Sequence, residues 1–320
     1  MRLGSSGKTR QPPESIPDAA PGTTLTDWHP TDTASCGPLH VPEFLNQEHP
    51  VIPHANGKPS KFALDFGLIG WLVLFRHAPY SRGVPGYEVF DHRERAAVDA
   101  VFQANGGVLF AHGFEDIRND VFRVREYEQA FAEYFNFPHA QAVSSGSAAL
   151  KIALECAGVL PGDEVIIPAH TFIATAEAVL QVGAVPVVVD IDESLNMDPK
   201  AFEGAVTSRT RAVVPVHMMG EMADMTSIAE IAHRLGLTVI EDCAQALGAT
   251  LGGVPAGSFS RAAAFSTDAG KTLCTGEGGM VVTFDANDHV HARARHDHGH
   301  AYDVSVPRGL DPAISSGFNY

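Results

Sequence analysis

Cysteine, tryptophan and long hydrophobic runs are scarce in this chain. Its 320 residues include two tryptophans and four cysteines, Cys36, Cys156, Cys243 and Cys274. The cysteines are widely spaced without a CxxC pair, which excludes a zinc ribbon or thioredoxin-type site and favours reduced thiols. The longest apolar run, residues 67–75, is about half the length of a membrane-spanning helix. Because no apolar segment of signal-peptide type follows the first basic residues, we expect a soluble, cytoplasmic protein.

Basic charge is also scarce. The chain has 22 Lys and Arg against 38 Asp and Glu, a net charge of −16 with histidine neutral. This balance argues against nucleic acid or an anionic membrane as the main partner, because both attract a basic surface. A small anionic ligand is compatible with it, since a few backbone N–H groups can bind phosphate locally. The hydrophobic content of 45% is sufficient for a core and excludes global disorder.

The N-terminal quarter differs in composition from the rest. Residues 1–83 are rich in Pro, Gly, Ser and Thr and lack clear periodicity, which predicts an irregular extension that is partly disordered. GSSGKT at residues 4–9 resembles part of a P-loop, but the first glycine of that motif would fall at Arg2 and no strand precedes it. We therefore expect two parts, with a compact domain over residues 84–320.

Helical and strand patterns alternate in this domain. Helices are predicted over residues 91–105, 123–135, 147–158, 171–183 and 225–236. Strands are predicted over residues 164–168, 185–190, 211–217, 238–242 and 262–265. Glycines at 158, 183 and 236 end three of the helices, as is typical of a left-handed cap. This order predicts an α/β fold with a mostly parallel sheet sandwiched by helices.

The segment SSGSAAL, residues 144–150, leads small residues directly into a predicted helix. The N–H groups of Gly146, Ser147 and Ala148 would lie at the positive end of that helix, where they could bind a phosphate. Ser145 or Ser147 could instead act as a plain helix N-cap, which is a common role for serine. In such folds ligands gather at the carboxyl ends of strands, and this segment is one of three that carry reactive residues there.

The other two segments carry Asp242 and Lys271. Asp242 ends an apolar strand, where a carboxylate needs a cation or hydrogen bonds, although it could also be an N-cap. Lys271 lies in a glycine-flanked loop between two apolar strands, an unusual place for a residue that is normally a solvated surface charge. A lysine can hold an aldehyde as a Schiff base, and a carboxylate can keep a pyridinium nitrogen protonated. With the phosphate site, these residues predict pyridoxal 5'-phosphate (PLP) as the cofactor.

From about Pro85 to Tyr320 the sequence resembles the DegT/DnrJ/EryC1/StrS family of sugar aminotransferases. The stretches that carry the resemblance follow the family's order: SSGSAAL, GDEVIIPAHTFIATAEAV, VDIDESLNMDP, TSRTRAVVPVHMMG, VIEDCAQALGA, KTLCTGEGGMVVT and GFNY. Within the family, PGYEVF, IRND and DHGHAYDVSVPRGLD resemble the transaminase that forms 8-amino-3,8-dideoxy-manno-octulosonate.

The resemblance implies the large domain of the PLP-dependent transferase fold of type I and a homodimer with shared active sites. Lys271 corresponds to the Schiff-base lysine, and Asp242 to the partner of the pyridine nitrogen. Phe172 corresponds to the aromatic residue that stacks on the ring, and Gln245 to a residue beside the cofactor. The phosphate-binding positions it implies are Gly146, Ser147, Ser266 and, from the neighbouring subunit, Asn319.

Four departures from the family pattern are visible. Ser147 replaces a usual Thr and keeps its hydroxyl, whereas Ser260-Arg261 replaces a usual Gly-Asp, which puts a local turn in doubt. Ala111-His112 stands where many members have Arg-Tyr, so substrate contacts are expected to differ. The sequence ends at Tyr320, before the small C-terminal domain of the family, so we expect a fragment or an early-terminated reading frame.

The expected function is therefore a PLP-dependent transfer of an amino group from glutamate to a keto-sugar in amino-sugar biosynthesis. The alternative is a truncated, inactive remnant of the fold that acts by binding or dimerisation. A dehydratase of the same fold is disfavoured, because such relatives carry His where Lys271 stands. The histidines at 289, 291, 296, 298 and 300 could bind a metal, but no set of carboxylates or cysteines completes a site, and we expect none.

Overall fold

The computed structural model describes residues 85–104, 121–301, 310 and 314–320. The chain divides into two units, Met1–Pro59 and Ser60–Tyr320, and every described residue lies in the second. The predicted extension over residues 1–83, the P-loop-like segment and Ala111-His112 lie outside the described residues. So do IRND and most of DHGHAYDVSVPRGLD.

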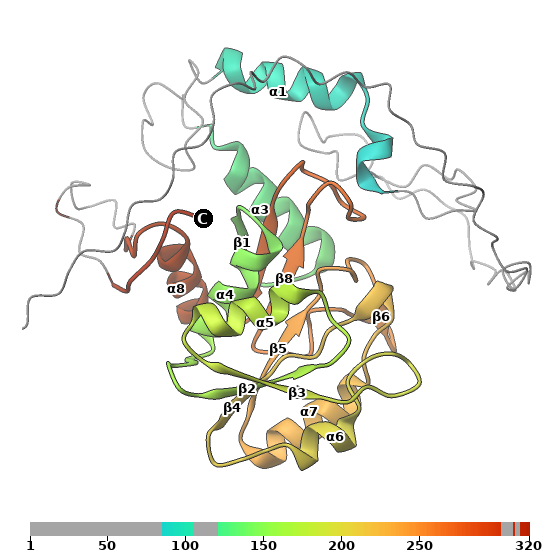
Figure 1. The fold of residues 1–320 in the computed structure, drawn as a ribbon. Coiled ribbons are helices and arrows are strands. Elements are labelled where there is room, and N and C mark those ends of the chain that lie inside the picture. The colour runs from blue at the N-terminus through green and yellow to red at the C-terminus, as the bar shows by residue number, and fades with distance from the viewer. Residues whose placement is uncertain (1–84, 105–120, 302–309, 311–313) are drawn as a thin grey trace, which may run out of the picture. The chain divides into compact units, whose positions relative to one another are not determined.

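Among the described residues, a seven-stranded sheet has the order β1-β9-β8-β5-β4-β2-β3 (Figure 1). The pairs from β8 to β3 are parallel, and β9 is antiparallel to both β8 and β1. This arrangement confirms the predicted, mostly parallel sheet. The strands are β1 (His139–Val143), β2 (Glu164–Pro168), β3 (Val185–Val189), β4 (Thr210–Val213), β5 (Thr238–Asp242), β8 (Ala262–Ser266) and β9 (Gly279–Thr283), with a small hairpin of β6 (Thr250–Leu251) and β7 (Val254–Pro255) beside them.

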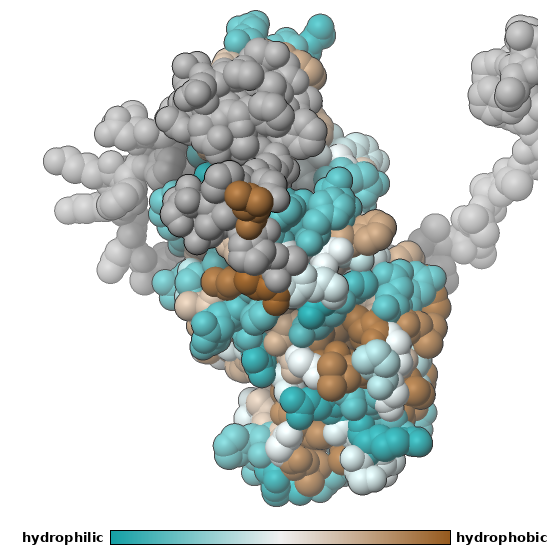
Figure 2. All heavy atoms as spheres, turned by 90° about the vertical axis from the view of Figure 1, so that its left-hand side faces the viewer, coloured by the Kyte–Doolittle hydropathy of each residue, from teal (hydrophilic) through white to brown (hydrophobic). Residues whose placement is uncertain are grey.

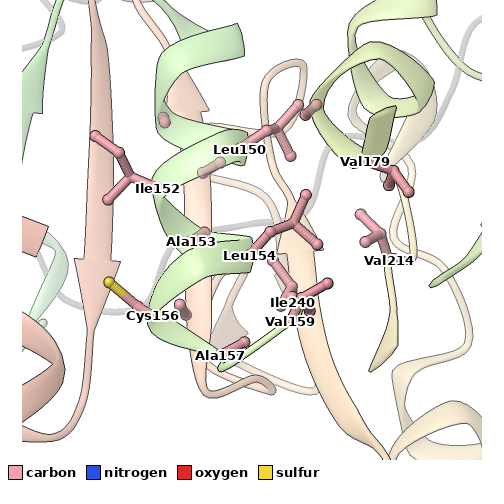
Figure 3. Close-up of a cluster of buried hydrophobic side chains, with 14 of the residues drawn as sticks. Leu150, Ile152, Ala153, Leu154, Cys156, Ala157, Val159, Val179, Val214 and Ile240 are labelled. Atoms are coloured by element: carbon pink, nitrogen blue, oxygen red, sulfur yellow. The ribbon is translucent and has the colours of Figure 1, made fainter. Parts of the chain in front are cut away.

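Helices cover both faces of the sheet. One face packs against α4 (Gly146–Cys156), α5 (Ile173–Gln181) and α8 (Ala286–His296). Along α4, Leu150 and Leu154 point into a cluster that also holds Val179 of α5 and Ile240 of β5 (Figure 3). The opposite face packs against α3 (Arg123–Phe135), α6 (Pro199–Gly204) and α7 (Met225–Leu235). The remaining elements are η3 (Gly86–Val89), η4 (Met218–Gly220) and α1 (His92–Ala104), and α1 buries none of its side chains.

The helix ends follow the expected chemistry. Gly236 ends α7 with φ 68°, and its N–H bonds back to the carbonyls of Ala232 and His233, the geometry of a left-handed cap. The glycines at 158 and 183 also have positive φ, 75° and 78°. The glycine prediction is therefore confirmed at all three helices.

Several elements of the described residues were not predicted, among them β1, α6, α8 and the hairpin of β6 and β7, and strand β4 is shorter than predicted. Strand β4 ends at Val213 rather than at residue 217, because Pro215 has no N–H to continue a sheet ladder. The N-cap of α8 is Asp285, whose side chain accepts the N–H groups of Asn287 and Asp288.

No helix within the described ranges is long and apolar enough to cross a membrane. On the face shown in Figure 2, the hydrophobic side chains of the described residues lie among hydrophilic ones. The three described cysteines, Cys156, Cys243 and Cys274, are buried and form no disulfide.

Candidate active site

The sheet register brings three strand ends together. Gly279, the first residue of β9, pairs with Val143 at the end of β1 and with Ser266 at the end of β8. Asp242, the last residue of β5, pairs with Ala264 of β8. The carboxyl ends of β1, β8 and β5 therefore meet at one edge of the sheet, where ligands gather in folds of this kind.

Helix α4 begins at this edge, directly after β1. The Ser145 side chain caps the helix by accepting the Ala148 N–H at 3.1 Å, so the plain N-cap interpretation holds for Ser145. The N–H groups of Gly146 and Ser147 have no hydrogen-bond partner within the described part of the chain. These two groups, at the positive end of the helix, are the donors available to an anion.

Ser266 stands beside this helix start. A Cβ atom at position 146 would lie 2.7 Å from the Ser266 Cβ and 3.2 Å from its Oγ, so the two residues are in direct contact. Ser266 is buried at the end of β8. Its hydroxyl and the two free N–H groups of α4 form a small cradle of donors, which we name the anion cradle (Gly146, Ser147 and Ser266).

Asp242 is a buried carboxylate at the same edge, with both oxygens hydrogen-bonded. Thr175 of α5 donates its hydroxyl to Oδ2 at 2.7 Å, and the Ala244 N–H donates to Oδ1 at 3.1 Å. Burial raises the pKa of Asp242 above its ordinary value, and the two hydrogen bonds and the charges of His217 and Lys271 act in the opposite direction. Such a group favours a cationic partner, and a protonated ring nitrogen would be one.

Lys271 lies in the loop that leaves β8. Asp268 shapes this loop: its carbonyl accepts the Lys271 N–H at 3.0 Å, and its side chain accepts the Gly270 N–H at 2.6 Å. On the other side, the Gly86 N–H donates to the Lys271 carbonyl at 2.8 Å. Position 86 has no room for a side chain, because a Cβ there would lie 2.8 Å from the Lys271 carbonyl oxygen. The PGYEVF segment thus holds the lysine loop, a contact that the sequence did not indicate.

Phe172 and Gln245 occupy two further positions. Phe172 directly precedes α5 and is 68% exposed, so its ring is available to cover a ligand. Gln245 lies three residues after Asp242, and its side-chain oxygen accepts the Met219 N–H at 2.9 Å. Met219 itself has φ 54°, a conformation that costs about 1 kcal/mol or more in a residue other than glycine.

The end of the chain is docked onto α8. The Phe318 N–H donates to the Arg295 carbonyl and the Tyr320 N–H to the His296 carbonyl, both at 3.0 Å. Tyr320 packs against the core. Asn319, between these two anchored residues, is exposed. Asn319 therefore lies at the surface, between two residues whose backbone N–H groups are held by α8.

Comparison with known proteins identifies the family. The model of the DegT/DnrJ/EryC1/StrS aminotransferase family matches residues 117–320, well over half of the chain. The chain belongs to this family.

Its relatives include enzymes that make amino sugars. GDP-perosamine synthase of Caulobacter vibrioides is 44% identical over 196 residues, covering 61% of this chain and 52% of that protein. L-glutamine:2-deoxy-scyllo-inosose aminotransferase of Streptomyces fradiae is 46% identical over 164 residues, covering 51% and 39%. The X-ray structure of the aminotransferase from Psychrobacter cryohalolentis matches with a TM-score of 0.65 at 36% identity, covering 72% and 58%. The chain thus spans about half the length of the curated relatives it matches, and the predicted aminotransferase fold is confirmed.

One departure from the family pattern has a structural explanation. Ser260 stands where the family usually has Gly, and its hydroxyl lies 2.8 Å from the Glu241 carboxylate and 2.9 Å from the Ala262 carbonyl, sharing its one hydrogen between these two acceptors. Arg261, where the family usually has Asp, forms two hydrogen bonds of 2.8 and 2.9 Å with the Asp288 carboxylate of α8. The turn before β8 is therefore well formed with these residues, and Arg261 ties it to a neighbouring helix.

Glu241 is a buried carboxylate that the sequence analysis missed. It accepts hydrogen bonds from His217, the Gly257 N–H, the Phe259 N–H and Ser260. The His217 ring accepts the Ala223 N–H at Nδ1 and donates from Nε2 to Glu241. His217 is thus a buried core residue with both ring nitrogens hydrogen-bonded. Strand alternation could have pointed to Glu241: consecutive residues of β5 point to opposite faces of the sheet, so Glu241 and Asp242 place two carboxylates on two buried faces.

His217 and Glu241 lie beside the Cys243 thiol. The atoms of these three residues that could bind a metal all lie within 4.8 Å of one another. A metal ion there would have to displace existing contacts, because both nitrogens of His217 and both oxygens of Glu241 already have protein partners. We interpret this cluster as structural. It fastens the 257–260 turn to β5.

Proposed function

We propose that this domain binds PLP and that the protein is a sugar aminotransferase. The observation that carries the proposal is the meeting of three features at one sheet edge: the anion cradle, the buried Asp242 and the lysine loop. An anion site and a buried carboxylate match the phosphate and the pyridine nitrogen of PLP, and Lys271 supplies the amine that PLP enzymes require. The residues present therefore fit the cofactor.

Each residue has a proposed role. The N–H groups of Gly146 and Ser147 and the Ser266 hydroxyl would hold the phosphate. Asp242 would keep the ring nitrogen protonated, with Thr175 and Ala244 holding its two oxygens in place. The sequence also predicts Ala148 as a phosphate-binding residue, but its N–H donates to the Ser145 cap, so its contribution would be positional.

The remaining roles concern the reacting side of the cofactor. Bound PLP supplies an electron sink. Lys271 would hold the cofactor through its amine and, once released, carry a proton to and from the substrate carbon. Phe172 would cover one face of the ring and exclude water, and Gln245 would lie beside the ring.

The proposed substrates are a keto-sugar and the amino donor glutamate. One relative is named for GDP-perosamine and another for 2-deoxy-scyllo-inosose, and the name of the second enzyme also includes L-glutamine. Polyhydroxylated keto compounds are thus the acceptor class among them. Glutamine is the donor to test beside glutamate. The keto precursor of the amino-octulosonate, which PGYEVF, IRND and DHGHAYDVSVPRGLD suggest, is the acceptor to test beside nucleotide sugars.

We also propose a homodimer located in the cytoplasm, with residues 84–320 as the cofactor-binding domain. The exposed position of Asn319 supports a contact with a second subunit's cofactor, and the unpaired cysteines suit a reducing compartment. The competing proposal is an inactive remnant that binds or dimerises without turnover. Amino transfer by the 320-residue chain, with glutamate or glutamine and a panel of keto-sugars, would exclude the remnant.

The cofactor assignment is tested by chemical trapping. The PLP-loaded chain is reduced with borohydride, digested and mapped by mass spectrometry. We expect a PLP adduct on Lys271, no adduct in Lys271→Ala, and an unchanged adduct in Lys200→Ala, a control at an exposed lysine of α6. An adduct that persists in Lys271→Ala would overturn the assignment.

A further inference from the structure

A cavity of about 520 Å³ lies outside the proposed active site. It is lined by α3, by the segment from Phe137 to Gln141 at the start of β1, and by α8, the three elements that meet at the β1 edge of the sheet (Figure 1). His139 and the anion cradle are at opposite ends of β1, about 13 Å apart at about 3.3 Å per residue. A ligand in this cavity would therefore not touch the cofactor site.

The lining of the cavity is polar and rich in basic groups. Arg125 and Arg293 contribute guanidinium groups, and His139, His289 and His296 contribute imidazoles. The acidic groups that face the same space are Glu128 and Glu133 of α3. The two arginines offset the two glutamates, so this lining lacks the acidic excess of a chain whose net charge is −16, and protonation of either glutamate leaves it with an excess of positive charge.

His289 adds an unsatisfied polar atom at this place. Its ring stacks on that of His139 with 4.8 Å between centroids and 11° between planes. Its Nδ1 is buried and has no hydrogen-bond partner among the described residues. Burial lowers the pKa of His289 to about 4, with the charges of His139, Arg293 and His296 acting in the same direction. The ring is therefore neutral at neutral pH and can donate from Nδ1 in one of its tautomers.

We propose that this cavity binds a small anionic metabolite through its carboxylate or phosphate group. Arg125 and Arg293 provide the counter-charges, and His289 provides a hydrogen bond through the atom that has no partner. The cavity volume falls within the range of small-molecule sites. The amides of Gln129 and Gln141, which also line it, suit hydroxyl or carbonyl groups on the rest of the ligand.

Glu128 makes the proposed binding depend on pH. Its Oε1 accepts the Gln141 amide at 2.6 Å and the Ala142 N–H at 2.9 Å, and burial raises its pKa to about 7, with Arg293 and Arg125 opposing that rise. A negative Glu128 repels the anion and a protonated one does not. Binding should therefore tighten as the pH falls through about 7.

Calorimetric titration of the PLP-saturated chain tests the proposal, with inorganic phosphate and citrate as separate probes. We expect saturable binding of at least one probe in the millimolar range or below. Arg293→Gln and Arg125→Gln should each weaken it about tenfold, the loss typical of one charge-assisted hydrogen bond. Arg125 is an exposed residue, so its variant should fold. Arg234→Gln is the control. Arg234 lies on α7, away from the cavity, and pairs with Glu203 of α6, so this variant should bind the probes like wild type.

Two further variants separate this cavity from the cofactor site. Gly146→Ala, which blocks the anion cradle, is titrated without PLP beside cofactor-free wild type. It should retain the binding, and loss in that variant would assign the anion to the cradle instead. Glu128→Gln should remove most of the difference in affinity between one pH unit below and one above its pKa of about 7. The proposal is wrong if neither probe gives saturable binding, or if both arginine variants bind as tightly as wild type.

Discussion

The backbone of Gly146 lies against the side chain of Ser266, 120 residues further along the chain, and leaves 2.7 Å for any Cβ at position 146. Contacts this short do not occur between real Cβ atoms. A side chain at 146 must therefore move either the start of α4 or the end of β8, and both carry the proposed phosphate donors.

Gly146→Ala is the first test of this relationship. We expect the fold to survive with a loss of about 1–3 kcal/mol, the usual cost of overpacking, and PLP affinity to fall further because the donors separate. Gly204→Ala is the matched control, since a Cβ there meets nothing within 4 Å. Urea unfolding and PLP titration of both variants are the measurements. Equal PLP affinity in the two variants would remove Gly146 from the site.

Asp242→Asn should weaken PLP binding but stabilise the cofactor-free chain relative to wild type as the pH rises. PLP binding should weaken by about 1.5–3 kcal/mol with the loss of a charge-assisted hydrogen bond. Burial raises the pKa of Asp242, so the stability it contributes to the cofactor-free chain is present below its ordinary pKa and lost as the pH rises through the raised pKa.

An asparagine at position 242 cannot ionise, so the variant does not lose stability in this way as the pH rises. Cofactor-free Asp242→Asn should therefore gain in melting temperature relative to cofactor-free wild type as the pH rises, while the difference narrows in acid. Differential scanning calorimetry across pH measures this. A variant that binds PLP like wild type contradicts the assigned role of the carboxylate.

Glu241→Ala should destabilise the domain strongly. The carboxylate is fully buried and accepts four hydrogen bonds, including that of His217, and each buried donor left without its acceptor costs about 1–3 kcal/mol. Glu203→Ala is the control, because its pair with Arg234 is exposed and worth about 1 kcal/mol or less. Chemical denaturation of the two variants compares them directly. Similar losses would mean that the buried network does not fasten the 257–260 turn.

Glu128→Gln should change how stability depends on pH. The pKa of Glu128 is raised from 4.5 to about 7 by burial, so its contribution to stability is complete below about 4.5 and is lost as the pH rises towards about 7. Melting temperatures measured across this window should fall more steeply for wild type than for the variant. Glu126→Gln, at a partly exposed ion pair on the same helix, should keep the wild-type profile.

Asn319→Ala tests the proposed sharing of the site between subunits. We expect PLP binding to weaken by about 0.5–1.5 kcal/mol, the range of a neutral hydrogen bond, without unfolding, because the anchoring bonds belong to Phe318 and Tyr320. PLP retention should also fall on dilution, since cofactor binding and association are linked. PLP titration and sedimentation at several protein concentrations measure both. A strict monomer that holds PLP as tightly as the dimer would contradict the proposal.

Local chemistry was enough to place most elements of the sheet and two features of the site. Apolar β-branched runs such as residues 238–242, separated by helices that end at glycine, indicate a parallel α/β sheet because each signal is contained in a few neighbouring residues. Gly146 at a helix start and Asp242 at a strand end were recognisable for the same reason. Strand β1 was not, because HAQAV has a single β-branched residue and becomes a strand through pairing with β9 and packing against α3.

Only the tertiary structure decided which distant residues meet. The contact between Gly146 and Ser266, the four donors around Glu241 and the ion pair of Arg261 with Asp288 each join segments that are remote in sequence. The cavity with its stacked histidines from β1 and α8 arises in the same way. Hydrophobic periodicity specifies which face of an element is buried, but the register between elements is set by packing of the whole domain, and that register places the donors, the carboxylates and the lysine loop at their positions.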